Sequence, residues 1–419
     1  MRRERIIGRI VQQHAEDAGD LRHLRSRLST FPAAGLEQLA EIDDRIDAHI
    51  DALAVAGEAG WHAAQQFLGE GDAPAQFPAC LLAIESRESA LIERCLALAE
   101  TAPKTRIAVT NALEWVFPHS LEGTVADLLR HASHTRRGLG LLACAMHCAD
   151  PGQALDRGIE DPDPSVRMSA LQTVGVLGRK EHASTCLAAI TDADPECRFW
   201  ATRSAVLLGE RDRALKALSE AGLAKRPQRA MAFRLALQAT STGAARGVLE
   251  WLAKDPAEIR WLVQGAGIAG DPTYIPWLIA RMEYPAHARL AGEAFTLITG
   301  ADITVANLEG ARPKNFEVGP NDNPQDPDVA MDPDEGLAWP DVTRVHQWWE
   351  SHAARYEGGT RYFMGAPVTR AHCIDVLKNG YQRQRILAAH YLCLLEPGTP
   401  LFNTSAPAWR QQKLLAQME

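Results

Sequence analysis

The sequence predicts an all-α fold, a solenoid (superhelix) of paired helices with a period of about 31 residues. One observation is a motif that recurs in register: Asp-Pro-Ser-Val-Arg-Met-Ser-Ala at residues 163–170 returns as Asp-Pro-Glu-Cys-Arg-Phe-Trp-Ala at residues 194–201. The other is a series of arginines that each open an apolar stretch, 31, 30, 31, 31, 31 and 29 residues apart, at Arg106, Arg137, Arg167, Arg198, Arg229, Arg260 and Arg289. Fixed-period self-similarity of this kind is typical of stacked helical units.

Residues 1–75 predict an N-terminal helical cap. Their apolar residues follow helical spacings of three and four, as at Leu39, Ile42, Ile46 and Ile50, but they lack the repeat motif. Terminal repeats of a solenoid are often atypical because one of their sides must face water. A breaker cluster at residues 69–74 separates this cap from the repeats.

Residues 76–302 predict the repeat array. In every unit except that of Arg137, a proline precedes the arginine by two to four residues, where its missing N–H suits the first turn of a helix. Gly178, Gly209 and Gly300 lie eleven residues after an arginine, where glycine can end a helix in a left-handed conformation. We therefore expect each arginine to open the second helix of a pair.

Residues 303–357 interrupt this rhythm as an acidic, proline-rich insertion with an aromatic docking segment. Six prolines among acidic residues between positions 310 and 343 exclude a regular helix or strand. Trp339, Trp348 and Trp349 at its end predict that it folds back and docks. Residues 358–419 predict a C-terminal helical repeat and cap, because Arg385 restarts the motif.

Composition narrows the class of protein. A net charge of −9 disfavours a protein that neutralises phosphates, so we expect no nucleic-acid partner. No run of eighteen apolar residues and no signal-peptide stretch appear, which predicts a cytoplasmic protein without a membrane partner. Eight cysteines without C-x-x-C spacing indicate buried free thiols in a reduced compartment.

Residues 161–170, Asp-Pro-Asp-Pro-Ser-Val-Arg-Met-Ser-Ala, resemble HEAT repeats of the short, 31-residue type. The resemblance is strong over residues 161–209 and looser over the remainder of about 78–302. It implies the fold but not the function. In such repeats the arginine commonly bonds to the acidic turn, so the resemblance implies intramolecular pairs for Arg167 and Arg198.

A second resemblance concerns residues 326–340, the sequence Gly359-Thr360-Arg361-Tyr362 and residues 382–389. These segments resemble an uncharacterised family of bacterial HEAT-like proteins often encoded with type VI secretion genes and their toxic effectors. The resemblance implies a non-catalytic, cytoplasmic immunity protein that binds and neutralises a toxin, for which a nuclease is one candidate. Two alternatives stay open: an effector-loading adaptor or scaffold, and a HEAT-like nucleic-acid glycosylase or lyase, which would need a basic groove and a catalytic carboxylate.

Two short motifs match patterns of cofactor-binding and metal-binding sites, but the sequence around each motif does not support such a site. Gly265-Ala-Gly-Ile-Ala-Gly270 matches the dinucleotide fingerprint, but it lies in register with the arginine helices, so its glycines indicate close helix packing and a helix end. Cys144, His147 and Cys148 could place zinc ligands on one helical turn, but no second cluster completes four ligands. We therefore expect no catalytic residues, no cofactor and no metal.

A face for a protein partner is the remaining functional prediction. Position five after the motif arginine should point away from the packed side, and tryptophans lie nearby; the residues are Asn111, Gln172, Arg203 and Arg234 with Trp115 and Trp200. Trp and Arg most often carry binding energy at interfaces, although Trp200 could instead fill the groove between repeats. We expect either a monomer or a one-to-one heterodimer with its partner.

The acids of the insertion are the second candidate for partner binding, and they are Asp326, Asp328, Asp332, Asp334 and Glu335. They could form a solvated or docked loop, or bind calcium, although their spacing does not match an EF-hand. They could also occupy the basic cleft of a nuclease toxin, where charge complementarity would speed association.

Overall fold

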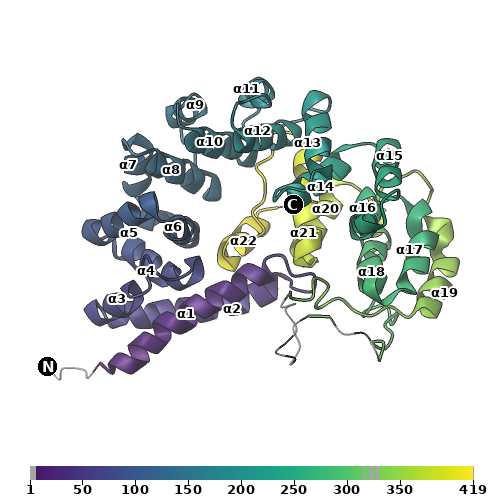
Figure 1. The fold of residues 1–419 in the computed structure, drawn as a ribbon, viewed down its shortest axis with the longest axis horizontal. Helices are drawn as coiled ribbons and strands as arrows, with labels where there is room; N and C mark the ends of the chain where they lie inside the picture. Colours follow the sequence, from purple (N-terminus) through teal and green to yellow (C-terminus); the bar gives the residue numbers. More distant parts are fainter. Residues whose placement is uncertain are drawn as a thin grey trace. The chain divides into compact units, whose positions relative to one another are not determined.

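The structure, a computed structural model, describes residues 6–314, 316, 318–319, 323, 325 and 330–418. Within these ranges the chain forms an all-α solenoid of 22 α-helices, with short 3-10 helices and a single two-stranded sheet (Figure 1). The predicted fold class is therefore confirmed. The helices fall into two compact units, each of which is described by itself.

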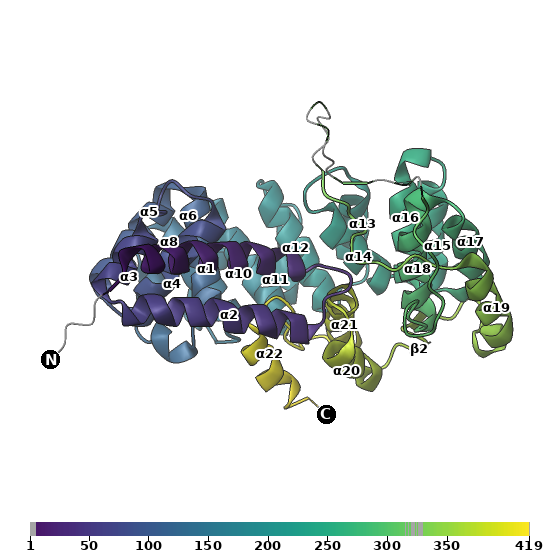
Figure 2. The same cartoon turned by 90° about the horizontal axis from the view of Figure 1, so that it is seen from below.

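The first unit holds the described residues up to Thr30, Ala34–Glu210 and the described residues from Glu396 onward. Its elements are α1 (Gly8–Leu28), α2 (Leu36–Val55), α3 (Glu58–Gln65), α4 (Ala73–Ser86), α5 (Ser89–Thr101), α6 (Pro103–Trp115), η1 (Pro118–Leu121), α7 (Thr124–Arg130), α8 (His134–Met146), α9 (Gln153–Ile159), α10 (Pro164–Val176), η2 (Lys180–His182), α11 (Ala183–Ala189), α12 (Pro195–Leu207) and α22 (Ala408–Leu415). Helices α1 and α2 pack along each other (Figure 2), and α8, α10 and α12 pack in sequence.

The second unit holds Phe31–Ala33 and Arg211–Leu395. Its elements are α13 (Arg213–Leu223), α14 (Arg229–Ala239), α15 (Thr242–Leu252), η3 (Pro256–Glu258), α16 (Ile259–Ala269), η4 (Pro272–Tyr274), α17 (Ile275–Met282), α18 (Pro285–Thr299), α19 (Val342–His352), η5 (Ala353–Arg355), β1 (Tyr362–Phe363), β2 (Ala366–Pro367), α20 (Arg370–Asn379) and α21 (Gln382–Leu395). The strands are antiparallel, with Tyr362 opposite Pro367 and Phe363 opposite Ala366.

The second helix of each central repeat begins as the motif predicts. Helices α10 and α12 start at Pro164 and Pro195, directly after the N-cap residues Asp163 and Asp194. The carboxylate of Asp194 accepts the N–H groups of the next two non-proline residues, both at 2.9 Å. Each such cap stabilises the helix by about 1 kcal/mol. The recurring Asp-Pro pair therefore sets where these helices begin.

Glycines end several of these helices in the left-handed conformation. Gly178, Gly209 and Gly300 have φ values of 66°, 108° and 71°, which confirms the predicted helix ends. The dinucleotide-like sequence lies inside α16 and ends at Gly270, which has a φ of 72°. A Cβ on Gly267 would lie 2.8 Å from Cα of Ala294 on α18. The interpretation that these glycines pack helices and end one is therefore confirmed.

One hydrophobic cluster of the first unit consists of aliphatic and aromatic side chains from α1 to α8, including Ile46, Leu53, Phe77 and Leu81. All eight cysteines belong to the described residues and are free thiols, and Cys148 is the exposed one. Among the described helices, none combines the length and the apolar character that a membrane crossing requires.

Candidate partner-binding surface

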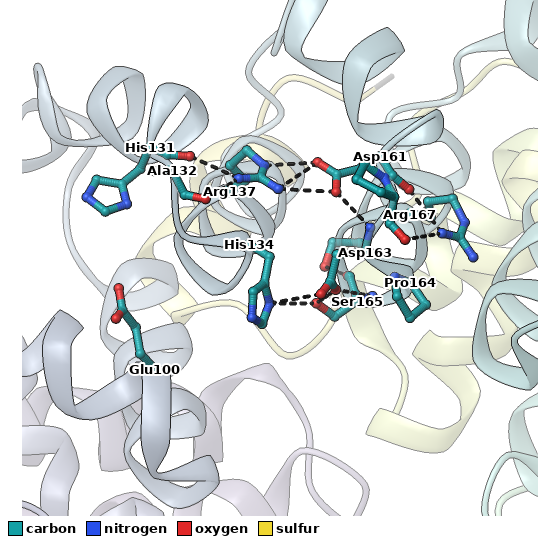
Figure 3. A network of polar contacts seen from close by, with 12 residues as sticks. Glu100, His131, Ala132, His134, Arg137, Asp161, Asp163, Pro164, Ser165 and Arg167 are labelled. Atoms are coloured by element: carbon teal, nitrogen blue, oxygen red, sulfur yellow. Dashed lines mark hydrogen bonds and ion pairs between the residues drawn. The ribbon is translucent and has the colours of Figure 1, made fainter.

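A ladder of ion pairs connects neighbouring repeats of the first unit (Figure 3). Arg137 donates from Nε and Nη2 to both carboxylate oxygens of Asp161, at 2.9 and 3.1 Å. Arg167 binds Asp192 in the same way, at 3.1 and 3.0 Å. Nη1 of each arginine also donates to two carbonyls of the turn that precedes its helix. The intramolecular pairing expected for Arg167 is confirmed.

The acidic turn holds both the ion pair and the helix start. Asp161 accepts the N–H of Asp163 at 3.0 Å, and Asp163 accepts the N–H of Ser165 at 2.9 Å (Figure 3). The hydrogen bond from Arg167 lowers the pKa of Asp192, so that carboxylate is ionised at neutral pH. Bidentate arginine–carboxylate pairs are strong and directional, so the ladder fixes the distance between repeats.

Arg106 and Arg198 lack the carboxylate of the ladder in the part of the chain that the structure describes. Arg106 donates to the carbonyls of Ala99 and Glu100, because the acid position, six residues before the next arginine, is His131. Arg198 donates only to carbonyls of the acidic turn, including that of Asp192. The pairing expected for Arg198 therefore exists through the backbone alone.

In the second unit, the acidic insertion provides the acids that complete the ladder. Both guanidinium nitrogens Nη1 and Nη2 of Arg260 bind the carboxylate of Asp334, at 2.9 and 2.6 Å. Arg289 binds the carboxylate of Asp332 at 2.9 Å and the carbonyl of Asp334 at 2.9 Å. In the first unit, the acid that pairs with a motif arginine comes from the turn of the next repeat. In the second unit, Asp332 and Asp334 of the distant insertion pair with the motif arginines instead.

Aromatic contacts hold the same segment in place. The Arg289 guanidinium lies 4.7 Å from the ring centroid of Trp339, and Phe316 meets that ring edge-on at 5.4 Å. Trp348 on α19 meets Phe295 on α18 edge-on at 5.5 Å. In its described residues, the insertion thus contacts helix α18 through Trp339 and Trp348.

These contacts decide what the acids of the insertion face. Asp334 is only 3% exposed and Asp332 is half-buried, and both bind internal arginines rather than face solvent. Glu335 is exposed. Asp326 and Asp328 lie outside the described residues. A decoy for a nuclease cleft therefore cannot use Asp332 and Asp334 in this conformation, and that interpretation is corrected for these two residues.

The position-five residues differ in exposure. Asn111 on α6 and Gln172 on α10 are half-buried, as is Arg234 on α14, where burial and then the charge of Arg383 lower the arginine pKa. Arg203 on α12 is buried, and its guanidinium lies 5.5 Å from the ring of Trp200. Position five does not point away from the packed side at Arg203, so the expectation is wrong there.

The two tryptophans also have different environments. Trp115 is 4% exposed, donates its indole N–H to Asp47 at 2.8 Å and meets Phe77 edge-on at 5.4 Å. It is a core residue, so its assignment to a partner surface is corrected. Trp200 is half-buried and meets the ring of Phe199 at 5.3 Å, which leaves part of it accessible.

Sequence reasoning missed how the C-terminal tail, residues 396–418, binds the first unit. The tail follows the C-terminal ends of the second helices, since the N–H of Leu401 donates to the carbonyl of Val176 on α10 at 2.8 Å. Arg410 donates to the carbonyls of Glu114 and Val116 at the end of α6, at 2.6 and 3.0 Å. It thereby satisfies carbonyls that the helix itself leaves unpaired.

A buried ion pair anchors the end of this tail. Arg25 on α1 and Asp43 on α2 lie 2.8 Å apart and are almost fully buried. Arg25 also donates to the carbonyl of Ala406 at 2.8 Å, and Asp43 accepts the N–H of Ala408 at 2.7 Å. The only signal in the sequence was an arginine beside Trp409 in a segment without helical periodicity.

The second unit uses an arginine in the same way. Arg361 donates to carbonyls at the end of α14, including those of Leu237 and Thr240 at 2.9 and 2.8 Å, and to that of Ala269 on α16 at 3.1 Å. Helix C-termini attract cations because their last carbonyls are unpaired and the helix dipole is negative there. The Gly-Thr-Arg-Tyr segment thus closes the ends of two repeat helices.

The tail also builds an exposed aromatic cluster, Phe117, His119 and Trp409. Phe117 is 49% exposed and stacks on Trp409 with ring centroids 4.2 Å apart. The ring of His119 also stacks with that of Phe117, with centroids 5.9 Å apart. The adjacent Arg410 is held by helix carbonyls, so the cluster has a rigid support. Exposed, well-supported aromatic residues are the type that anchors protein partners.

The possible zinc residues serve other purposes. Cys144 is buried, and His147 donates from Nε2 to the carbonyl of Leu113 at 2.7 Å. Burial and the nearby Arg410 lower the pKa of His147 to about 4. Throughout the described ranges, no three side chains of His, Cys, Asp or Glu gather as metal ligands would.

Comparison with known proteins agrees with this geometry. The family model of HEAT repeats matches residues 153–238, which run from α9 to α14. No curated protein matches the chain. A HEAT-like repeat protein is therefore supported, and such repeats usually form scaffolds that bind other proteins without catalysing a reaction.

Proposed function

Starting from the HEAT match, we propose that this protein is a non-catalytic scaffold that binds one protein partner, a type VI secretion toxin, and keeps it inactive in the cytoplasm. The identity of the partner comes from the resemblance of residues 326–340 and 359–362 to HEAT-like proteins encoded with such toxins. In this reading the protein is an immunity protein that forms a one-to-one heterodimer.

The observation that carries the binding function is the aromatic cluster on the first unit. Phe117 exposes a large apolar ring, although burying it in the core would stabilise the fold by about 1.5–3 kcal/mol. Trp409 and the buried tail beneath it hold the ring in one orientation, so little conformational entropy is lost when a partner covers it. Asn111 on α6 is half-buried and offers an amide that can hydrogen-bond a partner.

We propose steric exclusion rather than charge mimicry as the inhibitory mechanism. Asp332 and Asp334 neutralise arginines of their own unit, so they add little negative field toward a partner. We include Gln172 on α10 and the accessible part of Trp200 on α12, which are both half-buried, in the proposed surface. A toxin bound over this surface would have its active site, or an essential surface, covered by the scaffold.

The test is co-expression with the product of the neighbouring gene, using a matched pair of variants. Phe117→Ala removes the aromatic anchor, whereas Trp251→Ala removes an aromatic ring that is 50% exposed on α15 of the second unit. We expect Phe117→Ala to weaken the complex by a factor of about 10–100 and to abolish rescue from toxicity, while Trp251→Ala keeps both.

Other outcomes would favour the alternatives. Binding to secretion components without rescue would support an effector-loading adaptor or scaffold. Retention on nucleic acid at physiological salt would support a glycosylase or lyase instead. Equal affinity of the two variants for a confirmed toxin would show that the aromatic cluster is not the contact.

A further inference from the structure

A second feature of the first unit is a cavity of about 430 Å³ between neighbouring repeats. Its walls come from α7 and α9, and its floor is formed by Leu141 of α8 and Val166 of α10. Helices α7 and α9 are short, with seven residues each, and the small side chain of Ala154 lines the cavity between them. Its volume falls in the range of small-molecule sites.

The charge around this cavity is positive although the chain as a whole is acidic. Asp161 lines the cavity, but Arg137 neutralises its carboxylate through two hydrogen bonds. Arg130 and Arg157 line the same cavity, are exposed, and make no hydrogen bond or ion pair with any described residue. Two positive charges without a partner among the described residues therefore border one cavity.

His131 adds a directed donor to the same wall. Its Nδ1 accepts the N–H of Ser133 at 3.0 Å, so the neutral ring carries its proton on Nε2. The carbonyl of His131 is occupied by Arg137, which fixes the backbone beside the ring (Figure 3). The wall thus offers two guanidinium groups and one imidazole N–H, the donors that carboxylates and phosphates prefer.

The repeat itself does not require these charges. Arg130 lies seven residues before its motif arginine, and one repeat later that position is Glu160. Arg157 lies ten residues before the following motif arginine, and one repeat later that position is Ala188. Helix α10 nevertheless packs there against α9 and α12, and α11 packs against α12, with the same acidic turn and ladder pair. The two arginines are therefore a local feature of one gap rather than a structural need of every repeat.

We propose that this cavity is a binding site for a small organic anion, a carboxylate or phosphate ester with a compact apolar body. The anionic group lies between Arg130 and Arg157, within reach of Nε2 of His131, and the apolar body lies against Leu129, the partly exposed apolar side chain of the lining. The site is independent of the aromatic cluster and of the proposed toxin, so either can be disproved without the other.

The test is titration calorimetry with the full chain at low salt, using phenyl phosphate as the probe. We expect saturable one-site binding that is at least about tenfold tighter than that of inorganic phosphate, because only the ester also buries an apolar ring. Benzyl alcohol, which has the ring without the charge, should not bind measurably. The doubly substituted variant Arg130→Gln/Arg157→Gln should lose at least about tenfold in affinity for phenyl phosphate.

Two controls keep the result interpretable. Arg226→Gln removes one exposed charge from the second unit and should leave the affinity unchanged. Ala154→Leu fills the cavity without changing its charge and should abolish binding. The two arginines make no side-chain hydrogen bond or ion pair with described residues, but they lie in the last turns of α7 and α9, so the double variant should melt only slightly below the wild-type temperature. No binding of phenyl phosphate, equal binding of inorganic phosphate, or unchanged binding by the double variant would overturn the proposal.

Discussion

Replacing Asp43 by alanine should detach the C-terminal tail from the first unit. The carboxylate of Asp43 contacts two partners at once, Arg25 at 2.8 Å and the N–H of Ala408 at 2.7 Å. Removing it leaves the Arg25 guanidinium buried without its counter-charge, and it leaves a buried backbone N–H without an acceptor. The loss of one partner from a buried ion pair costs about 3–5 kcal/mol.

Asp44→Ala is the matched control, because Asp44 is the exposed neighbour on the same helix. This change removes the same charge with the same change in side-chain volume, and it should alter the free energy of unfolding by no more than about 0.5 kcal/mol. The difference in unfolding free energy between the two variants therefore measures the effect of burial and ion pairing, because both variants change the net charge and the helix propensity equally.

The assay combines urea denaturation with hydrogen exchange of the tail amides. In Asp43→Ala we expect the first unit to unfold at a lower urea concentration and the amides of Leu401 and Ala408 to lose protection, because both donate to acceptors of this docking site. A loss of less than about 1 kcal/mol with full protection at Ala408 would refute the reasoning, since the pair would then not anchor the tail.

Three further predictions follow from other contacts. Asp334→Ala should destabilise the second unit by about 1–3 kcal/mol in urea denaturation because it leaves an arginine of the ladder unpaired, whereas Glu335→Ala at an exposed site should have a smaller effect. His147 has a pKa near 6.5 in the unfolded chain but of about 4 in the folded state. The free energy of unfolding should therefore fall as the pH is lowered from 6.5 to 4. A His147→Gln variant that retains the whole decline would contradict this. Gly178→Ala should lower the melting temperature more than Gly152→Ala. Both glycines have positive φ, but only at Gly178 would a Cβ meet the tail, 2.3 Å from the carbonyl oxygen of Gly398. Equal shifts of the two melting temperatures would argue against that contact.

Local features of the fold were predictable because neighbouring residues determine them. Asp163 and Pro164 specify a helix start through a cap and a fixed φ, and Gly178 specifies a helix end. The pairing of Arg167 was expected because the acidic turn recurs at a constant spacing in the sequence. The tryptophans of the insertion predicted that it docks. They did not predict which arginines its acids would bind.

The candidate surface was predicted less well, because exposure depends on what packs against a helix from elsewhere in the chain. Trp115 has the composition of an interface residue, yet Asp47 on α2 and Phe77 on α4 surround it. Asp334 has the composition of a solvated acid, yet it pairs with Arg260. Neither partner lies within a few turns of these residues in the sequence.

By itself the sequence determined the repeat period, the order of helix pairs and the positions where α10 and α12 begin, since these depend on hydrogen bonds and torsion angles within a few residues. The tertiary structure alone decided that the tail returns to the first unit and that Asp332 and Asp334 complete the ladder of the second. Those contacts join segments up to several hundred residues apart, as Arg25 and Ala406 show, and their free energy depends on which surfaces meet and exclude water.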